Sequence, residues 1–177
     1  MANEFWEFDT SHSSVEFSVR HMVVAKVRGS FHKWSGKLNL DTENFAASSV
    51  EVAIETASID TRDAQRDGHL KSADFLDVEK YPTIDFKSTK VEKKGDTELR
   101  ITGSLTVHGV SKEVVLDAEY GGRAKDPWGG ERAGFHAKTK IDRREFGLQW
   151  NQVLEAGGVL VGDTVEITID VETKKAG

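Results

Sequence analysis

The sequence predicts an all-β protein whose antiparallel strands close into a barrel. Apolar and polar side chains alternate with a period of two over segments such as residues 15–20, 99–107 and 165–172, which indicates strands with one buried and one solvated face. Turn-forming residues separate these segments, as at Gly121-Gly122 and Asp126-Pro127. A sheet of about ten strands has to curl, split or close, and closure removes its exposed edges.

The alternation predicts eight to ten strands along the whole chain. They are expected near residues 5–10, 14–20, 23–28, 30–40, 48–57, 83–92, 97–108, 112–121, 132–142 and 163–174.

The segment from Ile59 to Asp77 interrupts the alternation and predicts one short helix with a loop. Asp60 or Thr61 is the expected N-cap. Spacings of four and three then place Arg62, Arg66 and His69 on one helical face. Because this segment lies off the barrel wall, we expect it to cover one end of the barrel as a lid.

Length and composition predict a single domain over residues 1–177. The chain has no cysteine and a net charge of −6, without the basic stripe that a nucleic-acid partner requires. No apolar run approaches the about 20 residues of a membrane-spanning helix. The N-terminal residues lack a signal-peptide pattern, so we expect a cytoplasmic protein, unless a leader has been removed.

The barrel interior is predicted to be either packed or open to one small ligand. Small residues stand in mid-strand on the apolar parity, at Gly103, Ala118 and Ala137. They leave volume along the barrel axis in one interpretation, and in the other they fit the taper of a packed barrel or mark bends. The pattern alone leaves both interpretations open.

Motifs for catalysis are weak. The sequence has no nucleophile elbow, phosphate-binding loop or dinucleotide fingerprint, so we predict no catalytic residue, metal or cofactor. The alternative is an enzyme on the same barrel that uses His12, His69 and His108, with Asp63 or Asp67, for metal-assisted or acid–base chemistry. Hydrogen bonding of these histidines to loops and strand ends is the simpler interpretation.

A series of short motifs in one order over most of the chain resembles the YceI-like family, whose members are described as polyisoprenoid- or lipid-binding. The motifs are Asp9-Thr10-Ser11-His12-Ser13, Ser58-Ile59-Asp60-Thr61, residues 66–75, Tyr81-Pro82-Thr83-Ile84, residues 103–112, residues 141–147 and Val161-Gly162-Asp163. Leu76 departs from the pattern, since relatives often carry a second phenylalanine there.

The resemblance implies an extended, lipocalin-like barrel with a long apolar tunnel and no enzymatic activity. It implies binding, sequestration or transport of an isoprenoid or a similar long-chain amphiphilic lipid as the small-molecule partner. Relatives often pair, so a homodimer is one expected assembly.

The candidate ligand-binding residues fall into two groups. The tunnel wall is predicted to contain Phe17, Val19, Phe31, Trp34, Ile54, Phe86, Leu105, Leu116 and Phe135. The polar mouth is predicted to contain Arg66, His69, Trp150 and Asn151. Arg66 is expected either to bind an anionic head group or, with Asp67, to fasten the lid to the sheet.

Overall fold

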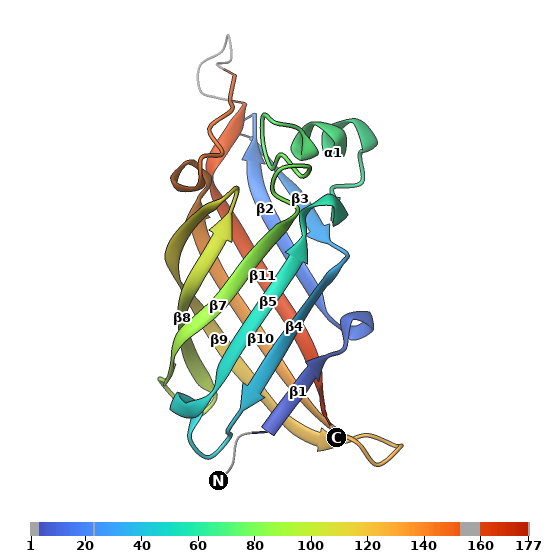
Figure 1. The fold of residues 1–177 in the computed structure, drawn as a ribbon, viewed down its shortest axis with the longest axis vertical. Helices are drawn as coiled ribbons and strands as arrows, with labels where there is room; N and C mark the ends of the chain where they lie inside the picture. Colours follow the sequence, from blue (N-terminus) through green and yellow to red (C-terminus); the bar gives the residue numbers. More distant parts are fainter. Residues whose placement is uncertain (1–3, 23, 153–159, 177) are drawn as a thin grey trace.

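A computed structural model, which describes residues 4–22, 24–152 and 160–176, shows an elongated barrel of antiparallel strands (Figure 1). The strands are β1 Glu4–Phe8, β2 Ser14–His21, β3 Ala25–Phe31, β4 Trp34–Leu40, β5 Ser49–Glu55, β6 Ile59–Asp60, β7 Thr83–Lys93, β8 Glu98–Val107, β9 Val110–Lys125, β10 Glu131–Asp142 and β11 Val161–Lys175.

Eight of the strands form a closed ring. Their order is β1-β4-β5-β7-β8-β9-β10-β11, and β11 pairs back onto β1. β11 is long enough to carry two neighbours on one edge, since Thr173–Lys175 pairs with β1 and Val161–Asp170 pairs with β2. β3 and β6 continue the sheet from β2. The predicted all-β antiparallel barrel is therefore confirmed.

The α-helix α1, Ala64–Lys71, lies over one end of the barrel, which we call the upper end (Figure 1). Short 3-10 helices η1 Thr10–His12, η2 Phe45–Ala47, η3 Thr56–Ser58 and η4 Arg143–Phe146 connect strands elsewhere. No helix among the described residues is long and apolar enough to cross a membrane.

The start of α1 differs from the prediction. Its N-cap is Asp63, whose carboxylate accepts the backbone N–H of Arg66, and not Asp60 or Thr61. Arg62 precedes the helix with a positive φ of 64°, so it does not share a helical face with Arg66 and His69. The predicted three-residue stripe was wrong because the chain needs a left-handed turn before the cap.

The strand prediction differs mainly at connections. The expected strand at residues 30–40 divides at His32 and Lys33 into β3 and β4, and β9 runs on to Lys125. β6 was missed because two residues, Ile59 and Asp60, are too few to show an alternation. They pair with Phe31 and Ser30 of β3.

Apolar packing divides into two clusters along the barrel axis. The lower cluster includes Trp6 and Leu40, each 1% exposed, and Phe45 of η2. The upper cluster includes Phe146, which is fully buried, and Leu76 beneath α1. The large buried rings of the lower cluster fill that end of the barrel.

Phenylalanine rings cover glycines on neighbouring strands. A Cβ added to Gly103 would lie 2.5 Å from the Phe86 ring, and one on Gly29 would lie 2.5 Å from the ring of Phe17. Gly103 therefore does not leave empty volume as one interpretation expected, because the Phe86 ring occupies the space above it. This arrangement fixes inward aromatic side chains against bare backbone.

We predict that Gly103→Ala lowers the free energy of unfolding by about 1–3 kcal/mol, because the new methyl overlaps both the Phe86 ring and the backbone oxygen of Lys87. Gly68→Ala in α1 is the matched control, since a Cβ there meets nothing within 4 Å. The control should stabilise the protein by about 0.5–1 kcal/mol. Urea unfolding measures both, and equal effects would contradict the interpretation of Gly103.

Candidate ligand-binding cavity

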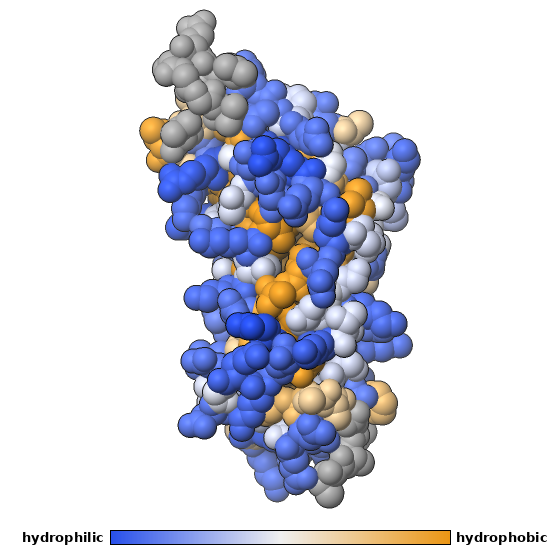
Figure 2. All heavy atoms as spheres, turned by 90° about the vertical axis from the view of Figure 1, so that its left-hand side faces the viewer, coloured by the Kyte–Doolittle hydropathy of each residue, from blue (hydrophilic) through white to orange (hydrophobic). Residues whose placement is uncertain are grey.

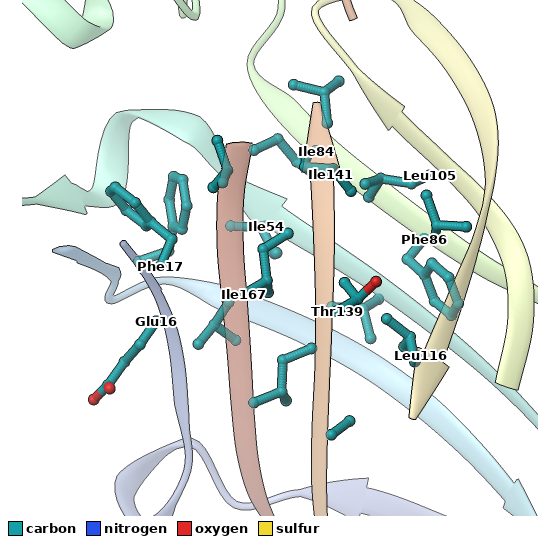
Figure 3. Close-up of a pocket in the computed structure, with 18 of the residues that line it drawn as sticks. Glu16, Phe17, Ile54, Ile84, Phe86, Leu105, Leu116, Thr139, Ile141 and Ile167 are labelled. Atoms are coloured by element: carbon teal, nitrogen blue, oxygen red, sulfur yellow. The ribbon is translucent and has the colours of Figure 1, made fainter. Parts of the chain in front are cut away.

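A cavity of about 380 Å³ runs inside the barrel. Its wall is built mostly from the inward-facing side chains of strands all around the barrel. Figure 3 shows Phe17, Ile54, Phe86, Leu105 and Leu116 projecting toward a common space from different strands. Because apolar and polar residues alternate along the strands, the side chains that face inward form a nearly continuous apolar lining.

All nine residues of the expected tunnel wall line this cavity. They are Phe17, Val19, Phe31, Trp34, Ile54, Phe86, Leu105, Leu116 and Phe135.

Of the small mid-strand residues, two contribute to the open volume. Ala118 of β9 and Ala137 of β10 are register partners, and both line the cavity. Their methyl groups replace the larger side chains found elsewhere on the wall. The interior is therefore open rather than packed, although Gly103 is not one of the reasons.

The upper end of the cavity carries an aromatic cluster that includes one histidine. The His69 ring lies 4.6 Å from the Trp150 ring and 5.1 Å from the Phe75 ring, both edge-on. His69 Nε2 hydrogen-bonds the carboxylate of Asp74 at 2.9 Å. His69 and Trp150 both line the cavity, so the structure brings these two expected mouth residues together.

Arg66 lines the cavity and also fastens the lid. Its Nε donates to the Thr61 hydroxyl at 2.8 Å, and its Nη2 donates to the Thr61 carbonyl at 2.7 Å. Asp67 accepts the backbone N–H of Thr61 at 2.9 Å. Two donors of the Arg66 guanidinium thus bind Thr61, the residue that follows β6, and tie it to α1.

Asn151 is placed beside the cavity and does not line it. Its amide donates to the carbonyl of Val161 at 2.7 Å and accepts the N–H of Val161 at 2.9 Å. These bonds hold the segment that carries Trp150 against the start of β11. The role that the structure shows for Asn151 is therefore fastening, one residue away from the cavity-lining Trp150.

Arg143 lines the upper part of the cavity, although the strand alternation gave no reason to select it. It is 3% exposed and donates to the backbone carbonyls of Leu148, Trp150, Val161 and Gly162. Burial lowers the pKa of the Arg143 guanidinium because it disfavours the charged form. In the sequence, Arg143 could have been selected because it lies in the family motif at residues 141–147.

Residues proposed for the alternative enzyme are not brought together. His69 of α1 pairs with Asp74, which follows the helix, and the ring of His108 packs at 4.6 Å on Tyr81. His12 lies on η1 at the junction of β1 and β2. The sequence-based constellation was wrong because these histidines follow different strands and cap different local turns.

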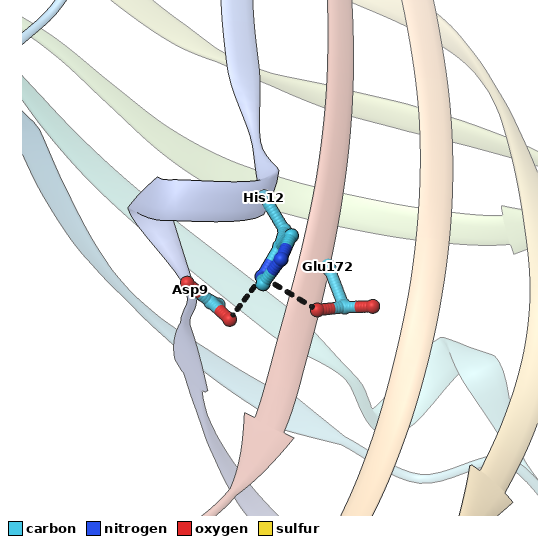
Figure 4. A group of neighbouring side chains, drawn as sticks. All are labelled: Asp9, His12 and Glu172. Atoms are coloured by element: carbon cyan, nitrogen blue, oxygen red, sulfur yellow. Dashed lines mark hydrogen bonds and ion pairs between the residues drawn. The ribbon is translucent and has the colours of Figure 1, made fainter. Parts of the chain in front are cut away.

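His12 belongs to a surface cluster with Asp9 and Glu172 (Figure 4). Its Nδ1 lies 2.8 Å from Asp9 and 3.4 Å from Glu172. Arg132 bridges the same two carboxylates at 2.8 and 3.4 Å. The hydrogen bond to Asp9 raises the pKa of His12, and the same bond holds the pKa of Asp9 well below its usual range. Arg132 already supplies a cation to both carboxylates.

We predict that Arg143→Gln lowers the free energy of unfolding by about 2–4 kcal/mol, because several buried carbonyls lose their donors. Arg144→Gln is the matched control at the next position. Arg144 is 55% exposed in its side chain and pairs with Asp142, so its loss should change stability by less than about 1 kcal/mol. Denaturant unfolding tests the pair, and a similar cost for both would contradict the structural role.

Comparison with known proteins identifies the family of this chain. The model of the YceI-like domain matches residues 6–173. A UPF0312 protein of Vibrio cholerae is 45% identical over 139 residues, which cover 78% of this chain and 74% of that protein.

Solved structures repeat the barrel. The crystal structure of a Campylobacter jejuni YCEI protein has a TM-score of 0.76 and 34% identity, and the match covers 89% of this chain and 90% of that one. A polyisoprenoid-binding domain from Saccharophagus degradans has a TM-score of 0.70 at 14% identity, over 97% of this chain and 98% of that one. The family match spans nearly the whole barrel, and the chain therefore belongs to the YceI-like domain family.

Proposed function

We propose that this protein binds one long-chain amphiphilic lipid, of the polyisoprenoid class, inside the barrel, and that it sequesters or carries that lipid. The observation that carries the proposal is the cavity of about 380 Å³ with its apolar lining. Its volume is within the range of about 300–1,000 Å³ typical of small-molecule sites. The structural likeness to a domain described as polyisoprenoid-binding supports the same class of ligand.

The physics of binding favours a chain without polar groups along its length. Each 100 Å² of lipid surface removed from water contributes about 2.5 kcal/mol. A polar group in the middle of the chain would meet mostly apolar side chains such as Ile54, Phe86 and Ile167, which offer no hydrogen bond. Selection therefore depends on the length and shape of the chain.

The distribution of charge orients the lipid with its head group at the upper end. Arg66, His69 and Arg143 all line that part of the cavity, and α1 covers it. The carboxylate nearest Arg143 is that of Asp163 at 4.0 Å, so the buried guanidinium is balanced mainly by neutral carbonyls. An anionic or strongly polar head group would be stabilised beside it.

A substitution that fills the cavity tests the proposal. Ile167→Trp adds a ring to the middle of the cavity (Figure 3) and should weaken binding of a fluorescent prenyl lipid by at least about tenfold. Thr168→Trp, on the opposite face of β11, is the matched control and should bind normally. Native mass spectrometry and fluorescence titration give the readouts. No uptake of any long-chain lipid by the unaltered protein would refute the proposal.

Head-group orientation is tested with a prenyl phosphate and the corresponding uncharged prenol. We predict that Arg66→Gln weakens binding of the phosphate by about tenfold and leaves the prenol unchanged. Arg62→Gln removes the same charge from the preceding turn, outside the cavity lining, and should affect neither lipid. A loss of stability in Arg66→Gln with equal affinity for both lipids would assign Arg66 to fastening the lid alone.

A further inference from the structure

The barrel wall has a seam without backbone pairing in its upper half. The ladder between β9 and β10 ends at the pair Asp117 and Lys138. Both strands continue beyond this point, β9 toward Val110 and β10 toward Asp142, and each stays paired to its other neighbour. Within residues 110–142, all of which the structure describes, the two strands therefore diverge.

One side-chain hydrogen bond bridges this seam. The hydroxyl of Thr139 on β10 donates to the carbonyl of Val115 on β9 at 2.8 Å, in a solvent-exposed position. Thr139 also lines the cavity. The Thr139 side chain thus contacts both the cavity and the solvent-exposed face of the barrel.

Apolar side chains border the seam on both strands. Val114 and Leu116 of β9 and Ile141 of β10 line the cavity, whereas Val115 points outward and is 43% exposed. The side of the barrel that carries β8 and β9 shows a band of apolar side chains between rows of polar ones (Figure 2). A lipid chain passing here would meet apolar groups throughout.

The two ends of the barrel and its paired seams are costlier routes into the cavity. The lower end is filled by Trp6, Leu40 and Phe45, and the upper end is covered by α1 with its bonds from Arg66 and Asp67 to Thr61. Opening any paired seam of the ring would break several backbone hydrogen bonds, each with a net contribution of about 1 kcal/mol. Opening the upper β9–β10 seam breaks the exposed side-chain bond of Thr139 and no backbone pair of the β9–β10 ladder.

We propose that single-chain lipids enter and leave the cavity sideways between β9 and β10, with Thr139 as the gate residue. This inference rests on the proposed lipid binding and adds its route. A side entrance lets the hydrocarbon chain move in along its length while the polar head stays in water until it reaches the upper end. A gate of this kind sets the rate of exchange and leaves the affinity unchanged.

The absence of cysteine from the chain allows a direct test. Val115→Cys is coupled to a bulky thiol reagent, and Glu119→Cys, an outward position on β9 within the paired ladder, carries the same adduct as the matched control. Stopped-flow fluorescence with a dansylated long-chain fatty acid measures both rates. The adduct at position 115 should slow association and dissociation together by about tenfold, with the dissociation constant nearly unchanged. The control adduct should alter neither rate.

Two further variants complete the test. Thr139→Val removes the bridging hydroxyl and should accelerate both rates. Gln65→Cys with the same adduct places bulk on α1 at the upper end and should leave both rates unchanged. Slower exchange from the α1 adduct, with none from position 115, would overturn the side entrance in favour of the upper end. If the unmodified protein takes up neither this probe nor a fluorescent prenyl lipid at equilibrium, the proposed lipid binding fails instead.

Discussion

The structure depends on the double pairing of β11. One edge of this strand pairs with β10, and the other pairs first with β2 and then with β1. The step between β2 and β1 occurs at Glu172, whose carbonyl accepts the N–H of Asp9 and whose N–H donates to the Ser13 hydroxyl. The ring closes only because the backbone groups at this junction find partners. The cluster of Asp9, His12, Arg132 and Glu172 side chains lies directly over the junction, which explains charged groups there without invoking a metal.

Closure through backbone bonds explains why the interior can remain open. In a packed domain an internal cavity costs stability, because the surrounding side chains lose contacts. Here every strand of the ring is held by backbone hydrogen bonds to both neighbours over at least part of its length, and dense packing is found in the lower cluster around Trp6 and in the upper cluster around Phe146. Ala118 and Ala137 belong to the lower cluster and face each other as register partners, and both also line the cavity.

The strand alternation was sufficient to predict the wall and insufficient to predict its ends. Phe17 and Phe135 could be placed inward because parity within a strand is a local property of the sequence. Arg143 could not, because its role depends on backbone carbonyls of later residues that the fold brings around it. The N-cap Asp63 could not either, because the left-handed turn at Arg62 that precedes it leaves no mark in the alternation. Gly103 is a third case. It was correctly assigned to the inward face, but the ring of Phe86 occupies the space that its missing side chain leaves. Resemblance to a family supplied the motif around Arg143 but no role for it.

Polar groups and backbone pairing are both distributed unevenly along the barrel, and one requirement of the ligand explains both distributions. A site for an apolar chain has to exclude water from its middle and admit a flexible ligand somewhere. The paired seams and the filled lower end exclude water, while Arg66 and Arg143 place guanidinium groups at the upper end. The seam between β9 and β10 lies beside that polar end, above the last ladder pair at Lys138. A chain that enters there reaches the apolar middle first, and its head group then meets the guanidinium groups without crossing the hydrophobic interior. Placing the weak seam lower in the barrel would separate the entrance from the charges that hold the head group.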